Sequence, residues 1–436
     1  MSDAVESTAP AARPSLLSAL SLRDFRLVWL GEGVSLLGDQ IYLVAVPWLT
    51  LQLTGSGLAL GLVSAATALP RAIFMLLGGA VTDRFSPRRV MLASNIMRMV
   101  LTALLCIAVL TETIQLWMLF VSALLFGTAD AFFYPAQNSI VPQIVGRDQI
   151  ESGNALVQIT AQLASFFGPA LGGLIIANLS GAADLSALEA AGRAPEASGI
   201  GAAIALNSLS FLVAAVALTF MRSGNAASST ASTTRQLLAS IAEGLRVVWS
   251  DPVFRVIVLL TASINFCIIG PISVGMPMLA DTRYAEGAAA LGAIYSSFGG
   301  GALLGVIIGG STKAPRRMGV IVMSLITLLG VMWTTYSIPL PLGAAVAVGV
   351  VIGLTVGYSN VVMISWLQKR TDPELLGRVM SIVMLGSVGL GPISSMLAGV
   401  LVEVNLGLLF AVSGALLILF AASALANPHV RAIGGE

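Results

Sequence analysis

The chain has 436 residues, of which 57% are hydrophobic and only 10% are charged, whereas soluble domains are roughly half apolar and a quarter charged. So few charges exclude a water-soluble globular protein of this length, and the net charge of +1 gives no reason to expect a nucleic-acid partner. Apolar runs of more than about 18 residues recur without the alternation of a membrane β-barrel. The sequence therefore predicts an all-α membrane protein.

Twelve apolar runs, separated by polar or Gly/Pro-rich stretches, predict twelve transmembrane helices. The expected spans are 27–53, 57–82, 90–111, 115–138, 154–178, 200–221, 255–279, 289–310, 318–337, 342–366, 379–402 and 405–426. Lys and Arg gather in alternate loops, so that the opposite loops hold only Arg193 and Arg283. Because cytoplasmic loops collect basic residues, we expect a multi-pass protein of the cell membrane with both termini in the cytoplasm.

The two halves of the chain resemble each other. GGAVTDRFSPRR at 78–89 is echoed by GGSTKAPRR at 309–317, and FGPALGG at 167–173 by LGPISSMLAG at 390–399. A half-chain repeat predicts two pseudo-symmetric six-helix bundles. The expected parts are a cytoplasmic tail (1–24), an N-terminal bundle (25–221), a cytoplasmic linker with an interfacial helix (222–252), a C-terminal bundle (253–426) and a second tail (427–436).

The loop between spans two and three carries a glycine, an Asp-Arg pair and a basic pair. These residues are Gly79, Asp83, Arg84, Arg88 and Arg89. They could be an ordinary basic inner loop, but in this position they resemble the signature of the major facilitator superfamily, in which such a cluster is thought to latch the outward-facing state. Ser86 and Pro87 depart from that pattern, and the second-half copy has Lys313 in place of the acid. The resemblance therefore implies the two-bundle fold and a one-sided latch.

Span five contains a proline among glycines, at Gly168, Pro169, Gly172 and Gly173. Proline bends a helix and glycines allow a neighbouring helix to approach, so packing alone could explain the run. It also resembles the GPxxGG core of antiporter and drug-efflux members of the superfamily. Stretches in spans one and four are similar to the branch with the enterobactin exporter and the macrolide efflux proteins. This resemblance implies export.

Five ionisable residues fall within the first-half spans, where a charge is costly and normally functional. Counting along the helices predicts a central layer of Asp39 with Arg71, and an inner layer of Glu32, Arg98 and Asp130. Asp39 is the expected proton acceptor, with Arg71 or substrate competing for its ionised form. The alternative is that both layers are static ion pairs between helices.

The second half offers uncharged candidates for a substrate cavity, namely Asn265, Tyr295, Tyr358 and Asn360. Such residues suit a bulky and mostly apolar substrate, although each could instead serve helix packing. No motif for a metal, a cofactor or an enzyme active site is evident.

These observations predict a monomeric secondary transporter that exports small amphipathic or hydrophobic molecules, drug-like or siderophore-like, by proton antiport through alternating access. Its expected partners are the lipid bilayer, a small-molecule substrate and protons. The alternatives are a facilitator, an importer or a lysophospholipid flippase without proton coupling, and a membrane sensor or scaffold that transports nothing.

Overall fold

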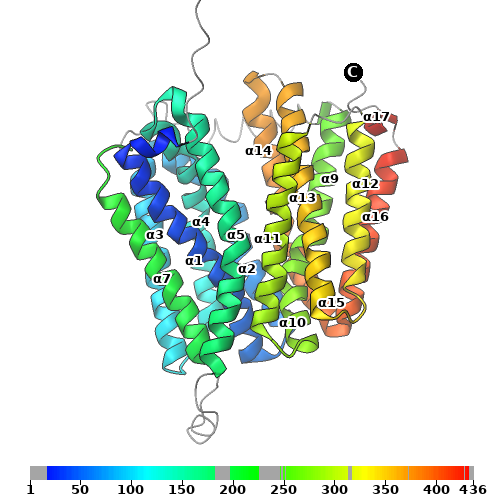
Figure 1. The fold of residues 1–436 in the computed structure, drawn as a ribbon, viewed down its shortest axis with the longest axis horizontal. Coiled ribbons are helices and arrows are strands. Elements are labelled where there is room, and N and C mark those ends of the chain that lie inside the picture. Colours follow the sequence, from blue (N-terminus) through cyan, green and yellow to red (C-terminus); the bar gives the residue numbers. More distant parts are fainter. Residues whose placement is uncertain are drawn as a thin grey trace, which may run out of the picture.

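The structure is a computed structural model that describes residues 17–181, 197–224, 246, 249–250, 252–312, 317–371, 373–426 and 428–431. Twelve helices in this part are long and apolar enough to cross a membrane, which confirms the twelve predicted spans (Figure 1). The expected interfacial helix within 222–252 lies almost entirely outside the described residues.

The first half forms α1 (Arg23–Thr54), α2 (Gly57–Arg84), α3 (Pro87–Leu110), α4 (Leu116–Ile144), α5 (Ile150–Gly181) and α7 (Ala197–Thr219). The second half forms α9 (Pro252–Gly270), α10 (Met276–Arg283), α11 (Ala288–Ser311), α12 (Met318–Thr335), α13 (Leu342–Arg370), α14 (Pro373–Gly389), α15 (Gly391–Val404), α16 (Leu406–Ala426) and the short α17 (Pro428–Arg431). A π-helical segment at Pro271–Gly275 joins α9 to α10 in one span, and a break at Leu390 separates α14 from α15 within another.

The outer faces of the helices carry large apolar side chains that are exposed in the described part of the chain. Leu104 on α3, Leu209 on α7 and Ile307 on α11 are each more than half exposed, at 59%, 54% and 57%. Contiguous apolar surface of this kind is costly in water and favourable against lipid tails. The exposed faces of the spans therefore form the lipid-contacting surface.

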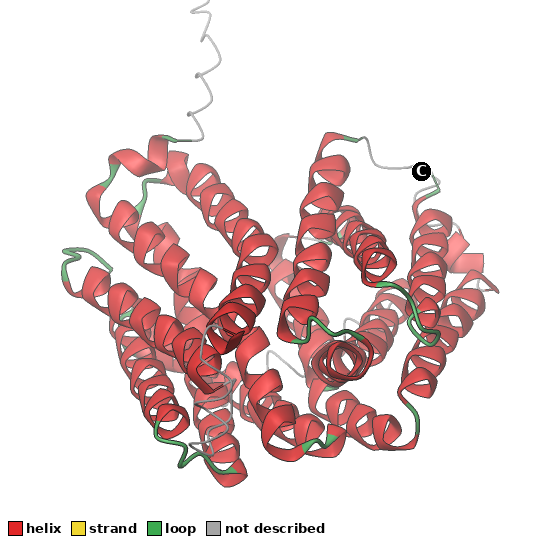
Figure 2. Cartoon of the chain, turned by 60° about the horizontal axis from the view of Figure 1, so that its bottom comes forward, coloured by secondary structure: helices red, strands yellow, loops and turns green. Residues whose placement is uncertain are grey.

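The helices form two bundles that lie side by side in both views (Figures 1 and 2). We call α1 to α7 the N-terminal bundle and α9 to α16 the C-terminal bundle. They meet along two seams, α5 with α11 and α2 with α15. At the first seam Gly173 and Gly292 are so close that a β-carbon on either would collide with the facing helix backbone.

The seams do not run the whole length of the bundles. We call the end with Arg23 and Ala426 the terminal end, which is uppermost in Figure 1, and the end with the α1–α2 turn at Gly55 the far end. The close approach of Gly173 to Gly292 lies between the middle and the far end of the bundles. The contacts of Gly57 and Gly61 with α15 lie in the same region. The bundles are thus joined at the far end, which positions an opening between them toward the terminal end.

Candidate functional site

A buried arginine occupies the centre of the N-terminal bundle. Arg98 on α3 is only 1% exposed. One of its terminal nitrogens, Nη1, lies 3.3 Å from a carboxylate oxygen of Asp130 on α4 and 3.7 Å from one of Asp39 on α1. The rings of Phe133 and Phe211 lie over the guanidinium, with centroids 3.9 and 4.5 Å from its Cζ. Arg98 therefore links three helices by charge and by cation–π contact.

A third carboxylate is connected to Arg98 through an amide. The Asn95 side chain accepts a hydrogen bond from Arg98 Nη2 at 2.5 Å and donates one to Glu32 at 3.1 Å. Both Asn95 and Glu32 are buried. Glu32, Asp39 and Asp130 thus form one connected cluster with Arg98 as its hub.

This arrangement modifies the expected pairing of Asp39 with Arg71, because Arg98 is the arginine within 4 Å of Asp39 and Arg71 acts on Asp39 only at longer range. The guanidinium of Arg71 lies 4.3 Å from the ring centroid of Tyr134, and its Nε atom has no hydrogen-bond partner. Arg98 instead reaches both expected layers, because an arginine side chain spans more than one helical turn and α3 directs it between α1 and α4. The two predicted layers are therefore a single cluster.

Asp39 is the most exposed member of the cluster. Its side chain is 31% exposed, whereas that of Asp130 is 9% exposed. One of its oxygens, Oδ1, is nevertheless buried without a hydrogen-bond partner. Asp39 is thus the carboxylate of the cluster that combines an unsatisfied oxygen with the largest exposed fraction.

A cavity of about 850 Å³ opens between the bundles. It begins near Pro169 and Tyr295, in the middle of α5 and α11, and extends along α13 as far as Leu367 in the last turn of that helix, at the terminal end. Most of its wall belongs to the C-terminal bundle, with α1 and α5 completing it. Its volume lies in the range of sites for drug-sized molecules.

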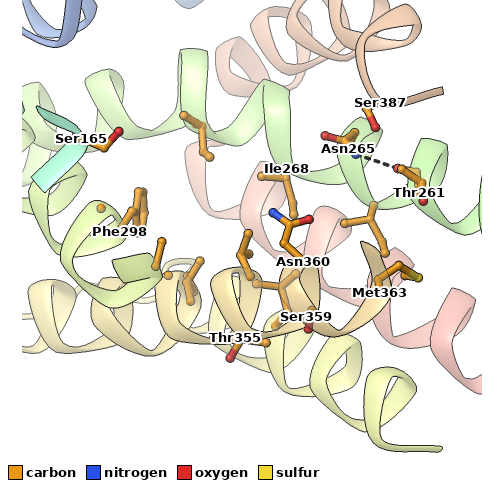
Figure 3. A pocket seen from close by; sticks show the side chains of 18 of the residues that line it. Ser165, Thr261, Asn265, Ile268, Phe298, Thr355, Ser359, Asn360, Met363 and Ser387 are labelled. Carbon is orange, nitrogen blue, oxygen red and sulfur yellow. Dashed lines mark hydrogen bonds between the residues drawn. The ribbon is translucent and has the colours of Figure 1, made fainter. Parts of the chain in front are cut away.

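The cavity brings together three of the four predicted cavity residues. Asn265, Tyr295 and Asn360 line it, as Figure 3 shows for the two asparagines. Tyr358 does not line the cavity. Its ring faces Gly309 of α11, where an added β-carbon would lie 3.5 Å from the ring. On a helix residues 358 and 360 lie about 200° apart, so only one of them can face the cavity.

The loop between α2 and α3 has a structural role that explains its departures from the family pattern. The Ser86 hydroxyl caps α3 by accepting from the amide of Arg89, with Pro87 at the first helical position. Arg88 donates to the carbonyls of Leu218 and Thr219, the last turn of α7, at 2.7 and 2.8 Å. The guanidinium of Arg84 lies 5.9 Å from the centroid of the Phe85 ring.

The side-chain surroundings of Gly79 and Asp83 in the same loop lie outside the described part of the chain. The latch that the resemblance implies therefore stays a prediction.

The glycine and proline run of α5 lies against both neighbours. Gly168 faces Gln40 of α1, and Gly172 faces Ile41 of the same helix. Gly173 faces α11 instead. The backbone amide of Ala170, which follows Pro169, donates a hydrogen bond to the Ser296 hydroxyl of α11 at 2.8 Å. The run thus forms part of the seam between the bundles.

Several residues of these sites were not predicted from the sequence. Asn95 stands three positions before Arg98, a spacing that places two side chains on one helix face. Gln40 and Gln162, which line the cavity, are polar residues within apolar spans and could have been found by that criterion. Phe133 and Phe211 carry no such signal, because aromatic residues are common in every span.

Comparisons with known proteins agree with this architecture. A family model described as the Major Facilitator Superfamily matches residues 28–396. The chain is 27% identical to the multidrug efflux pump Tap of Mycolicibacterium fortuitum over 374 residues, which cover 84% of this chain and 86% of that protein. It is 22% identical to macrolide efflux protein A of Streptococcus pyogenes, with coverage of 91% and 94%.

Solved structures resemble the chain at much lower identity. A mutant of the nucleoside transporter NupG has a TM-score of 0.70 at 12% identity, covering 92% of this chain and 99% of the other. A POT family transporter in complex with 5-aminolevulinic acid also has a TM-score of 0.70 at 12% identity, covering 94% and 97%. At this identity the likeness shows a shared fold.

Proposed function

Because the chain belongs to the Major Facilitator Superfamily, we propose that it exports small amphipathic or hydrophobic molecules in exchange for protons, by alternating access. The observation that carries the proposal is the cavity of about 850 Å³, which reaches the terminal end while the bundles are joined toward the far end. A central site open to one side at a time is what alternating access requires. The relatives named for multidrug and macrolide efflux support export as the direction.

The distribution of basic residues supports a cytoplasmic terminal end. Arg84, Arg88 and Arg89 lie at this end, as do Lys369 and Arg370, and cytoplasmic loops collect such residues. With this orientation the cavity opens to the cytoplasm, where an exporter loads its substrate. Both termini are then cytoplasmic, and the monomer is the proposed working unit.

The Arg98 cluster supports protons as the coupling ion. Its three carboxylates, Glu32, Asp39 and Asp130, exceed the two arginines of the region, Arg98 and Arg71, by one. An uncompensated charge in a membrane interior is expensive, so one bound proton makes this group of residues neutral. Asp39 is the proposed site of that proton, since it is the most exposed of the three carboxylates and has an oxygen without a partner.

The test is a comparison of cells with and without the gene across a panel of amphipathic drugs and siderophores. Export predicts that loss of the gene raises the accumulation of at least one compound, and that a protonophore abolishes the difference. Greater accumulation in cells that carry the gene would indicate an importer. No difference for any compound would overturn the proposal and favour a lipid substrate or a protein that does not transport.

A further inference from the structure

The polar groups of the cavity wall are uncharged. Among the described residues that line it there is no Asp, Glu, Lys, Arg or His, and its polar groups are the amides of Gln40, Gln162, Asn265 and Asn360, the hydroxyl of Tyr295 and several Ser and Thr hydroxyls. The remaining wall is mainly aliphatic, with Phe298 and several methionines. A charged group that leaves water for such a surface loses hydration without a counter-charge, so the wall favours uncharged molecules.

The direction of one amide is fixed by its partner. The Asn265 side-chain nitrogen donates to the backbone carbonyl of Thr261 at 2.9 Å (Figure 3). A carbonyl oxygen only accepts hydrogen bonds, so the amide nitrogen is turned toward the backbone of its own helix with one N–H used, and the side-chain oxygen is free to accept. Asn360 extends from α13 toward α9 and is exposed to the cavity. Asn265 thus offers its oxygen as an acceptor to a molecule between α9 and α13, and Asn360 offers an acceptor oxygen beside its N–H donors.

The carboxylates of the Arg98 cluster face a different way. Asp39 precedes the cavity residue Gln40, but consecutive helical residues are turned by about 100° from each other. Gln40 donates to Ser165 on α5 at 2.6 Å, whereas Asp39 faces Arg98. Neither Asp39 nor Glu32 nor Asp130 lines the cavity. A cation in the cavity therefore meets no carboxylate of this cluster.

We propose that the cavity selects an uncharged, mostly apolar molecule bearing hydroxyl or amide N–H donors, and that Asn265 and Asn360 determine this specificity by accepting from those donors. The inference rests on the proposed function, with the cavity as the transport site. It implies that substrate and proton occupy separate places, so that α1, which carries both Asp39 and Gln40, couples them through its movement. Direct competition for one carboxylate, as expected from the sequence, is not required.

The experiment measures efflux of two radiolabelled probes from cells that express the full chain. Chloramphenicol is uncharged and carries hydroxyl and amide donors, whereas tetraphenylphosphonium is a permanent cation of drug size. The wild type is expected to export chloramphenicol only. Asn265→Leu and Asn360→Leu are each expected to lower chloramphenicol efflux by roughly tenfold, which corresponds to one lost hydrogen bond at the upper end of its usual strength.

A gain of function makes the test independent of folding defects. Asn360→Asp places a carboxylate in the cavity and is expected to confer efflux of tetraphenylphosphonium. The matched control is Asn178→Asp, which adds the same charge near the far end of α5, outside the cavity, and is expected to confer none.

The remaining outcomes separate failure of this inference from failure of the proposed function. Export of tetraphenylphosphonium by the wild type, or unchanged specificity in Asn360→Asp, overturns this inference. If the chain exports a charged compound of the drug panel and not chloramphenicol, the inference fails and the proposed function stands. If it exports nothing, both fail.

Discussion

Arg98 lies 3.7 Å from Asp39 while it also contacts Asp130 at 3.3 Å through the same nitrogen. The Asp130 contact is the shorter of the two and the more deeply buried. Asp39 therefore has the weaker hold on the shared cation and the larger exposed fraction. In the proposed antiport mechanism, this asymmetry would let Asp39 exchange a proton while Asp130 keeps Arg98 in place.

Removal of Arg98 tests whether the cluster holds the N-terminal bundle together. Arg98→Leu leaves two carboxylates without their cation and is expected to lower the free energy of unfolding by about 3–5 kcal/mol. Thermal unfolding of the purified protein in detergent measures the loss. Arg26→Leu, at an exposed position of α1, is the control and should change little. The double variant Arg98→Leu/Asp130→Leu should recover part of the stability, and a double variant no better than the single one would contradict the role of Arg98 as the hub.

The seam between α5 and α11 depends on the absence of side chains. Gly292→Ala would place a β-carbon against the backbone of Pro169 and Gly173, and overpacking of this kind costs about 1–3 kcal/mol. We expect the variant to separate the bundles at this seam and to slow transport at least several-fold. Gly310→Ala on the same helix meets nothing within 4 Å and should transport normally. Equal rates in the two variants would show that close approach at the seam is dispensable.

A carboxylate joins the bundles at the far end. Glu403 at the end of α15 accepts from the Ser56 hydroxyl at 2.7 Å and from the Leu58 amide at 3.1 Å, across to the start of α2. A negative charge at a helix N-terminus is favourable, so this contact stabilises closure of the far end. Glu403→Ala should increase the fraction of molecules in which that end is open.

The opening can be measured by electron paramagnetic resonance between spin labels at Leu53 and Val404, which are both exposed. A population at longer distance is expected in Glu403→Ala. Glu286→Ala removes a charge within the loop between α10 and α11 and serves as the control. If both variants keep the distance distribution of the wild type, the contact of Glu403 does not govern closure.

The helices could be predicted from the sequence more accurately than the contacts of their polar side chains. Hydrophobic length defines a span, and the predicted 57–82 and 405–426 agree closely with α2 and α16. The irregular segments at Pro271–Gly275 and Leu390 were not predicted, because an apolar run has the same composition whether its helix is regular or interrupted. The resemblance in the loop at 78–89 correctly identified the family.

The pairing of the buried charges required the structure. Position along a helix predicts depth in the membrane, but the rotation of each helix about its axis depends on packing against its neighbours. The sequence therefore predicted one depth for Asp39 and Arg71, but it did not indicate which neighbouring helix each side chain faces. Arg98 reaches Asp39 because its long side chain extends from α3, which packs against α4 and α7, across to α1.

The central claim of proton exchange at Asp39 is tested most directly in proteoliposomes that contain a pH-sensitive dye. The substrate is a compound that the drug panel identifies, added to vesicles without an imposed proton gradient. The wild type should move protons against the direction of substrate flow, and Asp39→Asn should move substrate down its gradient without protons. Substrate-driven proton movement in Asp39→Asn equal to that of the wild type would contradict the account.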